Sequence, residues 1–214
     1  MQLKIDPYFV GTIILKFNMP KQFVDEINKL YDEKSEKLKD HNNELAGKIA
    51  KEKNCDEIMT ESLRQTFLNC FKQYITHIQK PNYIPVLDNV WINDMKANEY
   101  NPFHFHMSPM SDVGLSSVLM LNRPSTYGKE VSRPDTPSNG WLEFTGGNSD
   151  PLSISQVKLD AQVGDLFVFP YTLLHGVYPF NGTDEIRRTL SYNCNLMKPG
   201  FLMKPKLEKK YENK

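Results

Sequence analysis

The feature that most constrains the fold is a change in sequence texture near Tyr83. From there onward, short runs of β-branched and aromatic residues alternate with clusters of Pro, Gly, Asn and Asp. Closely spaced runs of this kind indicate the strands of a β-barrel or of a two-sheet sandwich. The predicted strands cover residues 83–97, 103–106, 115–121, 140–145, 152–158, 165–169, 174–178 and 186–196.

The first part of the chain has a different pattern. A β-rich alternating run predicts a strand over residues 7–17, and apolar residues at helical spacing predict helices over residues 20–38 and 55–79. The polar stretch 40–54 predicts mostly loop. Helices followed by a β-structured core make the fold class α+β, with the helices packed on one sheet of the core or, as the second option, forming a homodimer interface.

The domain organisation follows from these patterns. A length of 214 residues suits one compact domain. We expect an N-terminal strand and helices over residues 1–82, a β-structured core over 83–198 and a basic tail over 199–214. The loop 122–139 is long for a compact domain, and long loops often cover binding sites, so we expect it to act as a lid.

Composition excludes several classes of partner. The 26 Lys and Arg residues are balanced by 26 Asp and Glu residues, which argues against a nucleic-acid-binding protein because phosphate contacts need surplus positive charge. No apolar run reaches membrane-spanning length, so no membrane partner is expected. The three cysteines are far apart and lack CxxC spacing, which is typical of free thiols in a reducing cytoplasm. We therefore expect a cytoplasmic protein.

Three histidines form a candidate metal site. His104 and His106 are two residues apart in a predicted strand, so their side chains point to the same face, and His175 lies in a later strand. Single histidines are usually structural, and we interpret His41 and His77 in that way. Three imidazoles from two strand segments can instead cap one metal ion and leave open positions, which suits Fe(II) oxygen chemistry.

Two alternatives stay open for this metal site. Zinc held by three histidines and a water molecule is the main rival to iron. Asp112 is an alternative carboxylate ligand, although the chain would have to bend between His106 and Asp112 to bring it there.

A polar strand face follows the third histidine. In the predicted strand 186–196, one face carries Arg187, Thr189, Ser191 and Asn193, and the other carries Arg188, Leu190 and Tyr192. A polar face inside a small barrel is costly unless it binds something. Arg187 can bind a carboxylate with two hydrogen bonds and Thr189 can add a third, so we predict that they hold the far carboxylate of a keto diacid that chelates iron. The alternative is an ordinary surface ion pair.

Six motifs occur in a fixed order along the C-terminal half. They are Trp91-Ile92-Asn93, Asn101-Pro102-Phe103-His104-Phe105-His106, Ser116-Ser117-Val118-Leu119-Met120-Leu121, Gly164-Asp165-Leu166-Phe167-Val168-Phe169-Pro170, His175-Gly176-Val177-Tyr178-Pro179 and Arg187-Arg188-Thr189-Leu190-Ser191-Tyr192-Asn193. In this order the stretch resembles the Fe(II)/2-oxoglutarate-dependent oxygenases of the prolyl-hydroxylase-like superfamily. It is most similar to a small family found in bacteria and in phages of marine bacteria.

The resemblance implies a double-stranded β-helix, or jelly roll, with a metal at its open end. It implies a dioxygenase that uses Fe(II), O2 and 2-oxoglutarate, releases succinate and CO2, and hydroxylates an unidentified peptidyl or small-molecule substrate. The implied metal ligands are His104, His106 and His175. The implied cosubstrate-binding residues are Arg187, Thr189, Asn93 and Asn193, the two asparagines by hydrogen bonds to the cosubstrate or to a ligand histidine.

Two departures from the family pattern keep other functions open. The wider superfamily has His-x-Asp or His-x-Glu where this chain has His106, and a tyrosine-containing segment is replaced here by residues 117–120. A three-histidine cap also occurs in iron dioxygenases that use no keto acid. The alternatives are therefore a three-histidine cupin-like dioxygenase or zinc enzyme that does not use 2-oxoglutarate, and a non-catalytic jelly roll that serves as a structural or interaction module, for instance in a phage particle.

Overall fold

The computed structural model describes residues 11–42, 47–131, 134–147 and 153–199. The strands are β1 (Leu15–Asn18), β2 (Lys51–Asn54), β3 (Ile84–Met95), β4 (Asn101–His104), β5 (Gly114–Asn122), β6 (Leu142–Thr145), β7 (Gln156–Leu159), β8 (Asp165–Pro170), β9 (Leu174–Val177) and β10 (Arg187–Met197). The helices are α1 (Lys21–Lys34) and α2 (Glu61–His77), and short 3-10 turns are η1 (Ser35–Lys37) and η3 (Asp56–Ile58).

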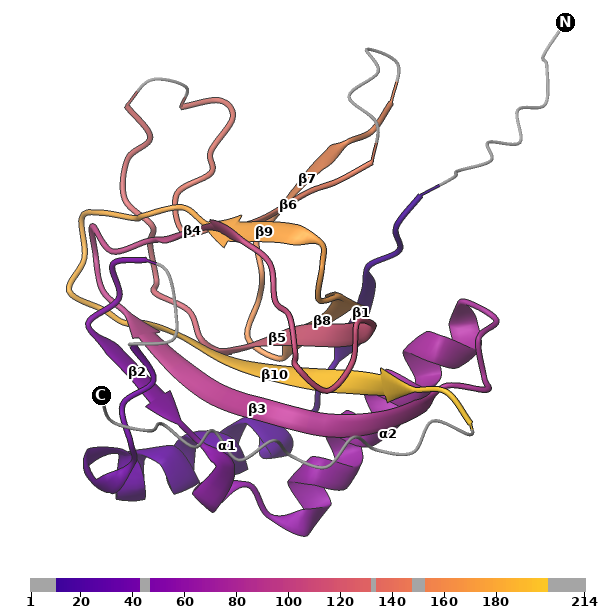
Figure 1. Ribbon diagram of the computed structural model, residues 1–214. Coiled ribbons are helices and arrows are strands. Elements are labelled where there is room, and N and C mark those ends of the chain that lie inside the picture. The colour runs from indigo at the N-terminus through magenta and orange to yellow at the C-terminus, as the bar shows by residue number, and fades with distance from the viewer. Residues whose placement is uncertain (1–10, 43–46, 132–133, 148–152, 200–214) are drawn as a thin grey trace, which may run out of the picture.

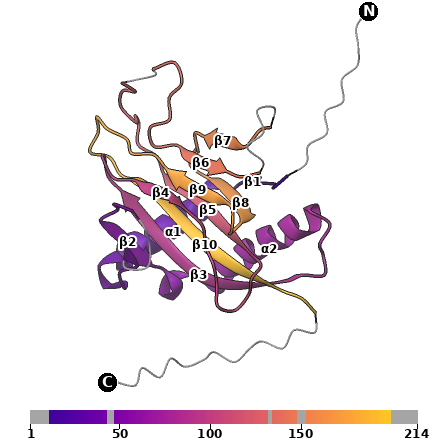
Figure 2. The same cartoon turned by 45° about the horizontal axis from the view of Figure 1, so that its top comes forward.

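The strands form two antiparallel sheets. The larger sheet has the order β1-β8-β5-β10-β3-β2, and the smaller has the order β4-β9-β6-β7. Figure 1 shows the smaller sheet facing one side of the larger sheet, while α1 and α2 lie against the other side. The turned view in Figure 2 shows the same layers, with both helices beneath the larger sheet. The predicted α+β class, with helices packed on one sheet, is therefore confirmed.

The helices cover the larger sheet because each presents one apolar stripe to it. In α1 the buried residues are Val24, Ile27 and Tyr31, spaced three and four residues apart. The stripe of α2 is also buried, and the helix begins at Thr60, whose side chain accepts a hydrogen bond from the Leu63 backbone N–H. Together with the outer face of the sheet they form the main apolar core.

The two faces of β10 have different surroundings, as its alternation predicts. Leu190 and Tyr192 belong to the apolar core under the helices. Residues of the other face, Arg187, Thr189 and Ser191, are also buried and turn toward the smaller sheet. That inner side has its own apolar cluster, formed by Val118, Met120, Leu142, Phe144, Ala161, Phe167, Phe169 and Leu173.

Part of the polar stretch 40–54 is a strand, which corrects the prediction of mostly loop. Residues 51–54 pair with β3 as the edge strand β2, with Glu52 opposite Asn93. The sequence Lys-Glu-Lys-Asn carries no apolar alternation. The strand forms because the exposed edge of β3 offers backbone partners, an interaction that local sequence does not encode.

Other element boundaries also differ from the predictions. The second helix begins at Glu61 and not at residue 55, because the 3-10 turn η3 precedes the Thr60 cap. The strand predicted over 103–106 is β4, Asn101–His104, so His106 lies beyond its end. The strand predicted over 7–17 is β1, Leu15–Asn18; residues 7–10 of that prediction, and the predicted tail from residue 200 onward, lie outside the described residues.

Neither α1 nor α2 is long and apolar enough to cross a lipid bilayer, and the same holds for every helix in the described part of the chain.

Candidate metal centre

Two of the predicted histidines lie on neighbouring strands. His104 ends β4 and is registered directly opposite His175 of β9, so their side chains share a face of the smaller sheet. The centroids of the two rings are 4.3 Å apart. Pairing of β4 with β9 thus brings together two residues that are far apart in the sequence.

His106 joins them from outside the strand. It follows the end of β4, where its backbone N–H donates to the carbonyl oxygen of Tyr171 at 2.8 Å. Its ring centroid lies 5.0 Å from that of His104 and 5.1 Å from that of His175. One ligand atom from each of the three histidines lies within 4.8 Å of the others. The three imidazoles therefore converge on one point.

Hydrogen bonds orient two of the three rings. Nδ1 of His104 lies 2.8 Å from the carbonyl oxygen of Pro102, and Nδ1 of His175 lies 2.8 Å from that of Leu173. Because a carbonyl oxygen only accepts, each Nδ1 carries the proton. Each Nε2 is then left with a free lone pair, which is the form in which histidine binds a metal.

The surroundings keep the imidazoles neutral. Burial, together with the neighbouring His175, His104 and His41, lowers the pKa of His106 to about 2. Burial and His104 lower the pKa of His175 to about 3, and burial also lowers the pKa of His104. Neutral rings that are protonated on Nδ1 fit a divalent cation, so these residues match the metal predicted for them.

Aromatic side chains enclose the histidines. The Trp91 ring centroid is 5.5 Å from His106, and the Phe169 centroid is 4.7 Å from His175. His41, interpreted from sequence as structural, stacks on Trp91 at 5.1 Å and is not part of the three-histidine group. Trp91 was not singled out as a site residue, although it lies two residues before Asn93 and so shares its strand face.

The alternative carboxylate ligand is not in the group. Asp112 lines a separate surface pocket with Phe105, Met107 and Leu174. Among the described residues, only His104, His106 and His175 have ligand atoms close enough to share an ion here. His77 lies in the last turn of α2, a helix that covers the opposite side of the larger sheet.

Arg187 is a buried cation with incomplete pairing. It is 2% exposed, and its Nε donates to the carbonyl oxygen of Gly140 at 3.0 Å. Its Nη2 has no hydrogen-bond partner among the described residues, and neither has the nearby hydroxyl of Tyr127. Burial lowers the pKa of Arg187, while Tyr127 acts in the opposite direction. A guanidinium in this state lacks an anion.

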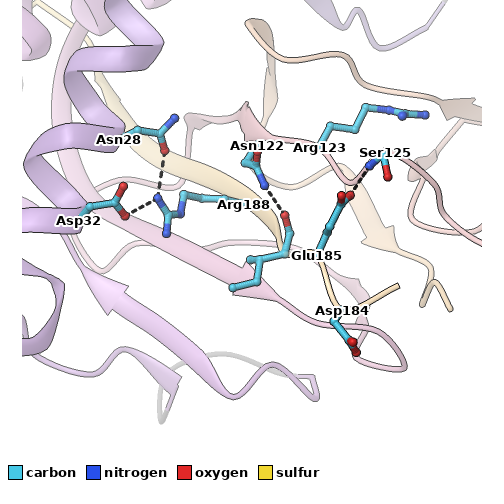
Figure 3. A pocket seen from close by; sticks show the side chains of 9 residues that line it. Asn28, Asp32, Asn122, Arg123, Ser125, Asp184, Glu185 and Arg188 are labelled. Atoms are coloured by element: carbon cyan, nitrogen blue, oxygen red, sulfur yellow. Dashed lines mark hydrogen bonds and ion pairs between the residues drawn. The ribbon is translucent and has the colours of Figure 1, made fainter. Parts of the chain in front are cut away.

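The neighbouring Arg188 shows the contrast. Its side chain points to the helix side, where Nε donates to Asp94 at 2.6 Å and Nη1 donates to Asp32 at 2.7 Å and to Asn28 at 3.2 Å. Figure 3 shows Arg188 reaching toward Asn28 and Asp32. Arg188 is therefore a structural ion pair, whereas Arg187 faces the interior without a counter-ion.

Other predicted site residues lie on the same interior face as Arg187. Thr189 is registered opposite Asn93 of β3. The interior side-chain atoms without a partner in the described structure include Asn93 Oδ1, Asn193 Oδ1, Trp91 Nε1 and Ser116 Oγ. Buried polar atoms are normally satisfied, so a group of unpaired ones fits a polar ligand. A ligand that carries an anionic group would pair with Arg187, the buried arginine of this face in the described part of the chain.

The comparisons with known proteins agree with this geometry. Residues 89–193 match the family model described as "Putative 2OG-Fe(II) oxygenase". The core belongs to the 2OG-Fe(II) oxygenase family. This family is one of oxidoreductases, and the matched stretch contains all three histidines together with Arg187 and Thr189. No curated protein matches the chain in sequence.

Solved structures show the same fold at low sequence identity. A Pseudomonas putida prolyl-4-hydroxylase superposes with a TM-score of 0.57 at 14% identity, covering 85% of this chain and 91% of that one. AviO1 from Streptomyces viridochromogenes Tue57 gives 0.57 at 13% identity, covering 91% and 93%. The viral collagen prolyl hydroxylase of Paramecium Bursaria Chlorella virus-1 gives 0.52 at 12%, covering 85% and 96%. The predicted double-stranded β-helix of this oxygenase core is thereby confirmed.

Proposed function

We propose that the chain is an Fe(II)- and 2-oxoglutarate-dependent dioxygenase that hydroxylates an organic substrate. In this proposal His104, His106 and His175 hold Fe(II), and Arg187 with Thr189 binds the far carboxylate of 2-oxoglutarate. When bound there, Fe(II) together with O2 and 2-oxoglutarate would supply the oxidising power, with succinate and CO2 as the products of the cosubstrate. The family match supports the class of reaction, and the site geometry supports the residue roles.

The observation that carries the proposal is the pairing of a three-histidine group with a buried, incompletely paired arginine. A buried guanidinium without an anion is costly, and a carboxylate that binds it relieves that cost. The rigid fork of Arg187 would orient the dicarboxylate, with its keto-acid end directed toward the histidines. Thr189, two residues along the same strand face, adds a hydroxyl donor.

The surrounding residues have defined tasks in this scheme. The hydrogen bonds from His104 and His175 to backbone carbonyls fix their rings, so Nε2 is presented without rearrangement. Trp91 and Phe169 exclude water from the faces of the rings. The roles predicted for Asn93 and Asn193, as hydrogen-bond partners of the cosubstrate or of a ligand histidine, stay predictions. We also place the enzyme in a reducing cytoplasm, because its three cysteines are buried free thiols.

A second candidate is a three-histidine dioxygenase that uses no keto acid. The observation in its favour is the donor set, because no described Asp or Glu joins the three histidines. In that enzyme the unpaired guanidinium of Arg187 would bind no cosubstrate. The 2-oxoglutarate-dependent function is therefore the better supported of the two.

The test is an anaerobic titration of the purified protein with Fe(II) and then with 2-oxoglutarate, followed by visible absorption. We expect a weak charge-transfer band that needs both additions, and succinate formation once air is admitted. The variant His104→Ala should give neither signal. Binding of Fe(II) to the wild type, with no band and no succinate after 2-oxoglutarate is added, would favour the second candidate.

A matched control is available on the surface. His77 lies in the last turn of α2 and outside the metal group, so His77→Ala should titrate like the wild type. Loss of the band in both variants would mean that histidine removal acts through stability and not through ligation.

A further inference from the structure

Glu52 belongs to the same interior face as the proposed site, although it lies outside every motif. It sits in β2, the edge strand next to β3, and is registered opposite Asn93. Asn93 is in turn registered opposite Thr189 of β10. Directly opposed residues of antiparallel strands share a face, so the three side chains form a row across the sheet. Figure 1 shows β2, β3 and β10 side by side beneath the smaller sheet.

This row is buried and offers acceptor atoms that nothing uses. Glu52 is 4% exposed and Asn93 is 5% exposed. Glu52 Oε1 and Asn93 Oδ1 have no hydrogen-bond partner in the described part of the chain. Unpaired buried oxygens of this kind are costly to keep, and a group that donates hydrogen bonds would satisfy both.

No Lys or Arg in the described part of the chain forms an ion pair with Glu52; the neighbouring Lys51 and Lys53 pair with Glu36 and Asp40. Burial and the neighbouring carboxylate of Glu99 raise the pKa of Glu52 to about 7, and no basic group acts in the opposite direction. Glu99 itself is engaged, because its two oxygens accept from the backbone N–H groups of Ala50 and Lys96 at 3.1 and 2.8 Å. Both oxygens of Glu99 are thus used by backbone N–H groups, whereas Oε1 of Glu52 has no partner.

Glu52 lies in the same row as Asn93 and outside the three-histidine group. The three-histidine group contains no carboxylate of the described residues. Asn93 lies two residues from Trp91, whose ring contacts His106. A molecule held at Glu52 and Asn93 would therefore lie beside the ligands and the cosubstrate row, where a substrate has to lie in order to react.

We propose that Glu52, with Asn93, binds a basic nitrogen of the substrate, an ammonium or a guanidinium group. This inference rests on the proposed function and adds to it the chemical class of the substrate. The cation donates hydrogen bonds to Glu52 Oε1 and Asn93 Oδ1 and supplies the missing positive charge. Recognition of this kind rejects a neutral analogue of the same shape, because the carboxylate would be left buried and unpaired.

The first test measures binding without iron. Thermal unfolding of the metal-free protein is followed with the N-acetyl amides of arginine and lysine, and with those of citrulline and norleucine as neutral isosteres. We expect the cationic compounds alone to raise the Tm by a few degrees. In Glu52→Gln this preference should disappear. Equal shifts with charged and neutral compounds, or no shift with either cation, overturn the inference.

The second test measures coupling to the reaction. With Fe(II) and 2-oxoglutarate present, the cationic compounds should stimulate 2-oxoglutarate consumption by about tenfold more than the neutral isosteres, and Glu52→Gln should lose that difference. Glu143→Gln is the matched control. Glu143 is another fully buried carboxylate, but it lies near Lys158 and opposite Gly176, so its side chain shares neither the strand face of His175 nor the row of Glu52. The control should keep the preference, and a control that loses it overturns the inference.

The two arms separate the two proposals. A charge-dependent Tm shift that needs Glu52, in a protein that never consumes 2-oxoglutarate, supports the binding site and removes the proposed reaction. Equal stimulation by the cationic and the neutral compounds, in a protein that shows the Fe(II)/2-oxoglutarate band, supports the reaction and removes the role of Glu52.

Discussion

Single residues decide what this interior can bind, and two adjacent arginines illustrate it. Arg187 and Arg188 are consecutive, yet one turns to the interior without a full set of partners and the other is held by Asp94 and Asp32. Strand alternation sends them to opposite sides of the sheet. The same residue type therefore stabilises the fold at position 188, whereas at position 187 the proposed function gives it the cosubstrate to bind.

The two arginines should separate in a matched pair of variants. Arg187→Met should raise the dissociation constant for 2-oxoglutarate by about a hundredfold with little loss of stability, because the cation it removes is only partly paired. Arg188→Met should leave that constant unchanged but lower the free energy of unfolding by about 3 kcal/mol, because Asp94 is left buried alone. Isothermal titration and urea unfolding measure the two quantities; a loss of affinity in Arg188→Met would contradict the assignment.

Glu52 gives a pH dependence with a defined sign. Its pKa is raised from 4.5 to about 7 in the folded protein. Below pH 4.5 the carboxyl is protonated in both the folded and unfolded states, and as pH rises through 7 the folded state loses stability relative to the unfolded one. Glu52→Gln should therefore gain stability over the wild type at pH 8 but not at pH 4.5, by up to about 3 kcal/mol. Urea unfolding at both pH values measures this, and a difference that does not change with pH would refute it.

At the scale of elements, the pairing of β4 with β9 sets the distance between two histidines of the proposed metal site. Gly176, next to His175, lies so close to β4 that an added Cβ would stand 3.0 Å from the Asn101 carbonyl oxygen and 3.1 Å from the Phe103 nitrogen. The two strands could accept a side chain there only by moving apart by a few tenths of an ångström. His104 and His175 would separate with them.

Gly176→Ala should therefore weaken metal binding more than it weakens the fold. We expect about a tenfold rise in the dissociation constant for Mn(II), used as a redox-stable substitute for Fe(II), with far-UV circular dichroism unchanged. Leu174→Ala is the control, because Leu174 is half-exposed and lies, like Gly176, on the face of β9 opposite to His175. Unchanged Mn(II) affinity in Gly176→Ala would show that the strands already tolerate the shift.

At the scale of the whole molecule, the site ties its two sheets together. The three histidines belong to β4, β9 and the segment after β4, whereas Arg187 and Thr189 belong to the larger sheet. A metal and a dicarboxylate bound between them would link both layers. Because ligands that bind only the folded state stabilise it, the loaded protein should resist unfolding better than either partial complex.

Mn(II) should raise the Tm by several degrees, and 2-oxoglutarate should add a further rise only when the metal is present. Differential scanning fluorimetry measures both shifts, and a chelator should reverse them. His175→Ala should show neither shift. A rise of equal size in that variant would place the stabilising metal at another site.

The sequence by itself determined which chemical groups are available and how they are spaced locally. The alternation of Arg187 with Arg188 follows from strand periodicity, and the helical stripes follow from apolar spacing. The same periodicity predicts that His104 and His106 point to one face, although His106 lies beyond the end of the strand. These patterns are local, so they can be read along the chain. The predicted α+β class depends on these patterns alone, whereas the packing of the helices on the larger sheet is seen only in the structure.

The tertiary structure alone decided which residues meet. It placed His106 beyond the end of β4, left Arg187 Nη2 unpaired, and made a strand of residues 51–54 that brings Glu52 opposite Asn93. The edge of β3 selects that strand through backbone hydrogen bonds, which any sequence can make and no local pattern announces. The sequence therefore identifies the candidate residues, and contacts between distant segments bring them together in one site.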